Sequence, residues 1–229
     1  MDIRLNYIEK GMGNPLVLLH GNGENHEYFE SQLEYFSPRF RVIAPDTRGH
    51  GGSERGKAFF TLDQFAIDLK ELMYSLGIDK ADILGFSDGG NIALLFALKY
   101  PALVRRLILN GANLFPSGMK TREYLSIITQ YAVLSVLSPF SANAFHKKEL
   151  YALMAKQPHI SPDSLRSLKM PVLVIVGTDD MIKESHTRLI CSSLPAGKLR
   201  IIKGDHFIAQ KKSPEFNKAV DEFLSEYKL

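Results

Sequence analysis

The chain has 229 residues, 45% of them hydrophobic, which is enough for one sizeable core and is within the range of a single α/β domain. Its 28 Lys and Arg against 25 Asp and Glu leave a net charge of +3, and because the basic residues are scattered in ones and twos no nucleic-acid-binding surface is predicted. Cys191 is the only cysteine, which excludes an internal disulfide bond and a cysteine cluster for structural zinc.

The N-terminal segment shows no sign of a targeting signal. Asp2, Arg4, Glu9 and Lys10 interrupt it, so it lacks the apolar stretch of a signal peptide, and no later run approaches a membrane span. A single cysteine is typical of a reducing compartment. We therefore expect a cytoplasmic protein with no membrane contact, and composition indicates nothing about its oligomeric state.

Short runs of β-branched and aliphatic residues alternate with amphipathic helical stretches. This order is typical of a parallel sheet built from βαβ units, with helices on both faces. Seven strands are predicted, at residues 3–8, 16–19, 41–44, 81–84, 107–109, 172–176 and 199–202. Helices are predicted at residues 28–36, 62–76, 91–99, 184–193 and 214–227. The predicted fold class is therefore α/β, with a mostly parallel sheet of about seven strands.

The alternation breaks once, at about residues 116–170, where helical patterns occur without a convincing strand. An insertion of this length between two strands is typical of a lid. Large apolar residues are frequent in it: Tyr124, Leu125, Ile127, Ile128, Tyr131, Leu134, Leu137, Phe140 and Phe145. We expect a short helical lid that packs on the sheet and encloses an apolar cavity, within a single domain of residues 1–229.

A Gly-x-Ser-x-Gly motif lies at residues 85–89, directly after the predicted strand 81–84 and before the predicted helix 91–99. The pattern alone is weak, but the strand-turn-helix context strengthens it. Such a sharp turn holds the serine clear of the sheet, and the helix N-terminus favours a developing negative charge. Ser87 is therefore the predicted nucleophile.

A serine hydroxyl is a poor nucleophile at neutral pH, so a base must accept its proton. His206 is the best placed of seven histidines, because it follows the last predicted strand at the edge where loops meet in this fold class. The other six are expected to make structural hydrogen bonds or to lie in the lid or on a surface helix: His20, His26, His50, His146, His159 and His186.

A carboxylate that orients the histidine is expected after the predicted strand 172–176, because the chain order in such sites is nucleophile, acid, histidine. Asp179 and Asp180 both meet this requirement. Position in the chain alone does not separate them.

Over nearly its whole length the chain resembles the α/β-hydrolase superfamily. Besides the motif at 85–89, the resemblance rests on the segments 18–23 (Leu-Leu-His-Gly-Asn-Gly), 45–53 (Pro-Asp-Thr-Arg-Gly-His-Gly-Gly-Ser) and 177–180 (Gly-Thr-Asp-Asp). The return from the lid at 162–171 also matches. The family's first antiparallel strand is absent, and the lid is short.

The resemblance implies which residues carry the chemistry. The family's Gly-x-x-Asp pattern favours Asp180 as the acid, with Asp179 as a turn or capping residue. It also implies an oxyanion hole formed by the backbone N–H groups of Asn22 and Asp88. Ser87 in place of an aspartate argues against the epoxide hydrolase and haloalkane dehalogenase branches, which attack with a carboxylate.

The resemblance implies a serine hydrolase that cleaves a small, largely apolar carboxylic ester through an acyl-enzyme at Ser87, with no cofactor. The same triad supports acyl transfer and the hydrolysis of carbon-carbon, thioester, amide and lactone bonds. A hydrolase-like receptor for a small molecule is an alternative, because such proteins retain a complete triad. An inert scaffold is disfavoured, because no triad member is missing.

Overall fold

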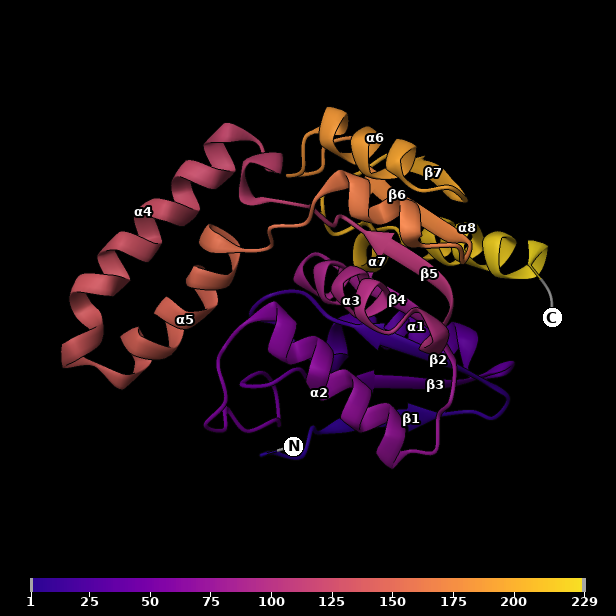
Figure 1. Ribbon diagram of the computed structural model, residues 1–229, viewed down its shortest axis with the longest axis horizontal. Helices are drawn as coiled ribbons and strands as arrows, with labels where there is room; N and C mark the ends of the chain where they lie inside the picture. Colours follow the sequence, from indigo (N-terminus) through magenta and orange to yellow (C-terminus); the bar gives the residue numbers. More distant parts are fainter. Residues whose placement is uncertain (1, 228–229) are drawn as a thin grey trace.

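The computed structural model describes residues 2–227, which form a seven-stranded sheet in the order β1-β3-β2-β4-β5-β6-β7 (Figure 1). Neighbouring strands are parallel except for β1, which is antiparallel to β3. The strands are β1 (Tyr7–Lys10), β2 (Asn14–Leu19), β3 (Phe40–Pro45), β4 (Ala81–Phe86), β5 (Val104–Asn110), β6 (Val172–Gly177) and β7 (Gly197–Ile202). The predicted α/β fold class is confirmed.

Helices cover both faces of the sheet. One face carries α1 (Glu30–Phe36), α7 (Ile208–Lys211) and α8 (Ser213–Glu226); the other carries α2 (Leu62–Ser75), α3 (Asp88–Lys99) and α6 (Glu184–Ser193). Short 3₁₀ helices complete the chain: η1 (His26–Phe29), η2 (Pro101–Leu103), η3 (Pro116–Gly118), η4 (Ser138–Phe140) and η5 (Pro162–Ser167).

The central strands are buried on both faces, because successive side chains point to opposite sides of the sheet. In β4, Ile83 packs into the core beneath α2 and α3, whereas Leu84 packs into the core beneath α1 and α8. All six residues of β4 and all six of β6 are buried, as expected for strands that are covered on both faces.

The first predicted strand, at residues 3–8, is misplaced, because the strand in the structure is β1 (Tyr7–Lys10). Ile3 and Leu5 are buried, but they pack against Leu72 of α2 without pairing to a strand. The edge strand begins only at Tyr7 and is exposed throughout. An alternating hydrophobic pattern indicates which residues are buried, but not that they form a strand. Here the buried residues belong to a coil segment.

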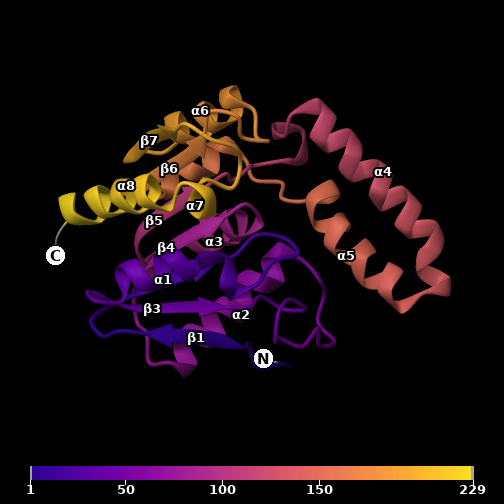
Figure 2. The same cartoon turned by 180° about the vertical axis from the view of Figure 1, so that it is seen from behind.

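Two helices, α4 (Thr121–Leu137) and α5 (Ala142–Lys156), are inserted between β5 and β6 and form a helical hairpin with η4 at its tip. The hairpin projects beyond the end of the sheet at which the parallel strands have their carboxyl ends (Figures 1 and 2). Leu153 of α5 lies in the main core, so the inner helix is seated on the body. In α4 only Ile127 and Leu134 are buried.

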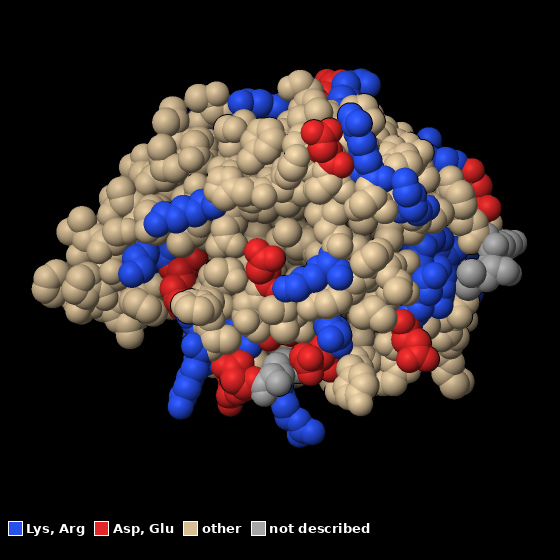
Figure 3. Space-filling model, in the orientation of Figure 1, with Lys and Arg blue, Asp and Glu red and all other residues tan. Residues whose placement is uncertain are grey.

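The expectation that the apolar residues of this insertion pack on the sheet is therefore wrong for the outer helix and the tip. The exposed residues are Leu125, Val133, Val136 and Leu137 of α4 and Phe140 of η4, together with Phe145 in the first turns of α5. The surface formed by α4 is mostly free of charged side chains (Figure 3). Among residues 2–227, no helix is both long enough and apolar enough to span a membrane.

His186 fastens the first segment of the insertion to α6. Its Nε2 accepts a hydrogen bond from the backbone N–H of Leu114 at 2.9 Å, and its ring lies so close to Gly118 that an added Cβ would be 2.6 Å away. The side chain lies on the buried side of α6, and burial lowers the pKa of His186 to about 4.

We expect His186→Gln to reduce the loss of stability in mild acid. Because the pKa of His186 in the folded protein, about 4, lies below the ordinary value of 6.5, the unfolded chain binds the proton first. The contribution of His186 to the free energy of unfolding is complete above about pH 6.5 and is lost as the pH falls toward 4. Between pH 7 and 5 the free energy of unfolding of the variant should fall by roughly 1–2 kcal/mol less than that of the wild type.

Urea unfolding at pH 7 and pH 5 measures this difference. His159→Gln is the matched control, because His159 is exposed and should leave the pH dependence unchanged. An equal pH dependence in the wild type and both variants would contradict the prediction.

Candidate active site

The predicted nucleophile lies at the junction of β4 and α3. Ser87 has φ 53° and ψ −120°, and it is the one non-glycine residue with positive φ among those that the structure describes. Its N–H donates to the carbonyl of Asn110 at 2.8 Å, and its own carbonyl accepts from the N–H of Asn91 at 3.0 Å. The residue therefore ends the sheet ladder and starts the helix at the same point.

The structure brings the three predicted triad side chains together. His206 follows β7 and lies with its Nε2 3.0 Å from Ser87 Oγ and its Nδ1 2.8 Å from Asp180 Oδ1. Asp180 Oδ1 also accepts the N–H of Ile182 at 2.9 Å. His206 and Asp180 are buried, whereas Ser87 keeps some exposure. This line of contacts can move a proton from the serine hydroxyl to the imidazole.

Asp179 occupies a different position from its neighbour. Its side chain is exposed and accepts from the hydroxyl of Thr178 at 3.0 Å, and its N–H donates to the carbonyl of Gly204 at 2.9 Å. Only Asp180 of the two contacts His206. The geometry thus gives Asp179 a turn position.

The loop that carries Asn22 is held by His20. The Nε2 of His20 accepts the N–H of Thr47 at 2.9 Å, so its proton is on Nδ1, which donates to the carbonyl of Gly21 at 2.7 Å. In a trans peptide the N–H points opposite to the carbonyl, so the N–H of Asn22 points away from His20. Burial lowers the pKa of His20 to about 3, which keeps it neutral in this role.

Asn22 and Asp88, the two predicted oxyanion residues, touch each other. The side-chain amide of Asn22 donates to Asp88 Oδ2 at 2.8 Å. Asp88 is the first residue of α3, so its backbone N–H has no acceptor within the helix. A Cβ on Gly89 would lie 2.1 Å from the carbonyl oxygen of Leu19, so the loop and the helix start are in close contact.

Two further groups near the site were not found by sequence reasoning. Glu24 accepts the N–H of Gly21 at 3.1 Å, and burial raises its pKa to about 7. Tyr28 is stacked on Phe86, with ring centroids 4.3 Å apart. Glu24 follows the loop motif by one residue, which is a weak signal, and nothing in the pattern marks Tyr28 as a neighbour of the site.

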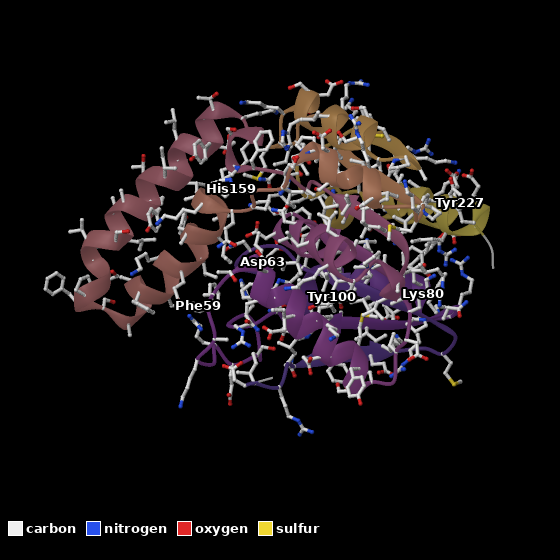
Figure 4. The ribbon with its side chains drawn as sticks, viewed as in Figure 1. Phe59, Asp63, Lys80, Tyr100, His159 and Tyr227 are labelled. Atoms are coloured by element: carbon white, nitrogen blue, oxygen red, sulfur yellow. The ribbon has the colours of Figure 1, made fainter. Side chains whose placement is uncertain are left out.

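Figure 4 places Phe59 and His159 on the side of the sheet body nearest the hairpin, and Lys80 and Tyr227 at the opposite end.

Within residues 2–227, no group of three His, Cys, Asp or Glu side chains is placed to hold a metal ion.

Comparison with known proteins identifies relatives over the whole chain. The profile of the alpha/beta hydrolase fold family matches residues 14–130, more than half of the 229 residues. The human serine hydrolase BPHL is 28% identical over 246 aligned positions, which cover 97% of this chain and 83% of that protein. The soluble epoxide hydrolase of Corynebacterium sp. is 39% identical over 124 positions, 54% of this chain and 43% of that protein.

An uncharacterized protein of Mycobacterium bovis is 38% identical over 103 positions, 45% of this chain and 30% of that protein. The chain therefore spans less than half the length of this relative and of the Corynebacterium relative.

Solved structures share the fold over nearly the whole chain. A thermophilic esterase from Thermogutta terrifontis superposes with a TM-score of 0.81 at 25% identity, covering 98% of this chain and 94% of that one. A meta-cleavage product hydrolase from Pseudomonas fluorescens IP01 gives 0.79 at 22% identity, covering 99% and 96%. The family match over more than half of the residues leads to one conclusion: the chain belongs to the α/β-hydrolase family.

Proposed function

We propose that the chain is a serine hydrolase that cleaves a small, largely apolar carboxylic ester through an acyl-enzyme at Ser87. The observation that carries this proposal is the continuous line of contacts from Ser87 Oγ through the His206 ring to Asp180, with 3.0 and 2.8 Å between the hydrogen-bonding atoms. A hydroxyl, an imidazole and a carboxylate in this order are the parts of a general-base-activated nucleophile.

In the proposed reaction, His206 Nε2 accepts the proton as Ser87 Oγ attacks the ester carbonyl. Asp180 fixes the tautomer of His206 with the proton on Nδ1 and stabilises the imidazolium that forms. The imidazolium then gives its proton to the leaving alcohol. Water, deprotonated by the same Nε2, hydrolyses the acyl-enzyme and restores Ser87.

The negative oxygen that develops in both steps needs hydrogen-bond donors. We assign these to the backbone N–H groups of Asn22 and Asp88, which the side-chain contact between these two residues keeps close together. The positive end of α3 adds a favourable field at the same point.

The helical hairpin is proposed to act as the lid of this site. Its root adjoins Asp180, where Met119 forms a bridge with Ile182 and packs with Ile127 of α4. These apolar side chains support a substrate with an apolar acyl or alkyl part. The proposed mechanism needs no cofactor, and the proposed substrate is a small molecule.

Ser87 argues against epoxide opening, although one of the relatives is named an epoxide hydrolase. The epoxide hydrolase branch attacks with a carboxylate that stays bonded to the substrate carbon, whereas a serine needs an acyl carbon. A panel of chromogenic esters, thioesters and lactones with acyl chains of increasing length tests the substrate class. Turnover of the thioesters or lactones in preference to the esters would move the proposal to that bond.

Ser87→Ala is expected to lower ester turnover by several orders of magnitude and to leave the fold intact, because triad members act as a unit. A fluorophosphonate should label the wild type, with the adduct on Ser87 by mass spectrometry. Turnover that survives in the purified variant, or an adduct on another residue, would reject Ser87 as the nucleophile.

Asp180→Asn is expected to lower turnover by about three to four orders of magnitude, because the amide no longer fixes the tautomer of His206. Asp179→Asn is the matched control and should change the rate by less than about tenfold, since its carboxylate only makes a turn contact. Steady-state kinetics of both variants decide the matter. The reverse order would make Asp179 the acid.

A further inference from the structure

We infer that the side chain of Asn22 is a latch that makes the oxyanion hole depend on the position of α5. The inference rests on the proposed function, because it concerns the same oxyanion donors. It assigns a positioning role to a side chain whose backbone N–H alone was implicated by the family resemblance.

The amide group of Asn22 uses both of its hydrogens, and it uses them on different parts of the molecule. Nδ2 donates to Asp88 Oδ2 at 2.8 Å and to the backbone carbonyl of Leu150 in α5 at 3.0 Å. One planar group therefore joins the two proposed oxyanion donors to each other and to the inner helix of the hairpin. Two acceptors in different directions define the plane of the amide, and through the short side chain they restrict the backbone of Asn22.

The hydrogen bond from Asn22 is important for Asp88, because the carboxylate has few other donors. Its carboxylate is buried, and its two oxygens accept from the amides of Asn22 and Asn91, at 2.8 and 3.1 Å. Burial raises the pKa of Asp88, and the hydrogen bonds from the amides of Asn22 and Asn91 act in the opposite direction by stabilising the charged form. Without Asn22, one buried carboxylate oxygen loses its donor, which is costly enough to make the start of α3 rearrange.

The inner helix has attachments of its own, so its position is set independently of Asn22. Glu149 forms a two-pronged ion pair with Arg55, at 2.9 and 2.6 Å, and Gln157, just after α5, accepts the N–H of Leu62 at 3.1 Å. The side chain of Asn22 therefore contacts a helix, α5, whose position is determined by other contacts. When α5 is in place, the amide is held; when α5 moves out, one of its two acceptors leaves.

The test combines two substitutions that act at different places. Asn22→Ala keeps the backbone N–H and removes the latch, whereas Glu149→Ala loosens α5 without changing any residue of the loop that carries Asn22. Glu222→Ala is the matched control, because it removes an exposed ion pair with Arg200 on the far side of the sheet. Kinetics of a chromogenic ester and thermal unfolding are measured for each single variant and for Asn22→Ala combined with Glu149→Ala.

Asn22→Ala should lower kcat about tenfold and leave KM within about twofold. This is less than the hundredfold or greater loss for removal of a donor, because the donor remains but is misplaced. Glu149→Ala should lower kcat about fivefold in the wild type and less than twofold in Asn22→Ala. Its effect on the melting temperature should be the same in both backgrounds, so a merely structural role would not reproduce the kinetic pattern.

Two results would overturn the latch: kcat of Asn22→Ala within twofold of the wild type, or an equal kinetic effect of Glu149→Ala in both backgrounds. If Asn22→Ala does not fold, Asn22→Ser replaces it, because a hydroxyl has one hydrogen and cannot hold both acceptors.

Hydrogen exchange separates failure of the latch from failure of the proposed function. Glu149→Ala should speed amide exchange at residues 20–24 in the wild-type background and not in Asn22→Ala. This readout needs no turnover. A wild type that hydrolyses none of the esters would remove the proposed function, and the exchange result would still decide whether α5 and the loop are coupled; unchanged exchange at residues 20–24 would remove the latch.

Discussion

The abrupt change of direction between β4 and α3 is the constraint on which the rest of the site depends. A positive φ at a serine costs on the order of 1–3 kcal/mol and persists only where the surroundings impose it. Here they do, because a Cβ on Gly85 would lie 2.2 Å from the carbonyl oxygen of Gly89, and one on Gly89 would lie 2.1 Å from that of Leu19. β4, the start of α3 and the end of β2 therefore approach one another so closely that only glycine fits at positions 85 and 89. Ser87 lies between these two glycines and is held by the same contacts.

Burial also adjusts the charges around this point. A full negative charge near the proposed oxyanion hole would oppose the negative charge that develops in the proposed acyl transfer. Glu24, with its pKa raised by burial to about 7, and Asp88, with its pKa raised by burial, both bind a proton more readily than an exposed carboxyl. The same burial keeps His20 neutral, so the loop is positioned by hydrogen bonds more than by full charges.

Sequence patterns predicted the parts of this molecule that depend on local periodicity. The central strands and the helix Glu184–Ser193 were predicted to within a few residues, because continuous apolar runs and amphipathic stripes arise from burial on both faces or on one. The first strand was misplaced because Ile3 and Leu5 satisfy the pattern from a coil. The outer helix α4 was expected to be covered, and no pattern in one chain tells a buried apolar stripe from an exposed one.

At the site, motif context predicted which side chains the fold would gather, and the structure brings Ser87, Asp180 and His206 into contact. It could not predict the contact of Asn22 with the carbonyl of Leu150, because every residue of a helix has a carbonyl and the two positions are 128 residues apart. Contacts of this kind depend on how the hairpin is seated, which is a property of the tertiary structure alone.

The place of the hairpin in the chain divides the site between two segments. Ser87 and the loop of Asn22 precede it, whereas Asp180 and His206 follow it, and the turn at η4 (Ser138–Phe140) is exposed at its tip. A chain cut at that turn would become two fragments, neither with a complete set of reacting groups. Parallel pairing of β5 with β6 and the seat of α5 would be what reunites them. Recovery of the proposed hydrolase activity would then report on association of the fragments, which makes the hairpin tip a suitable place to split the chain into two complementing fragments.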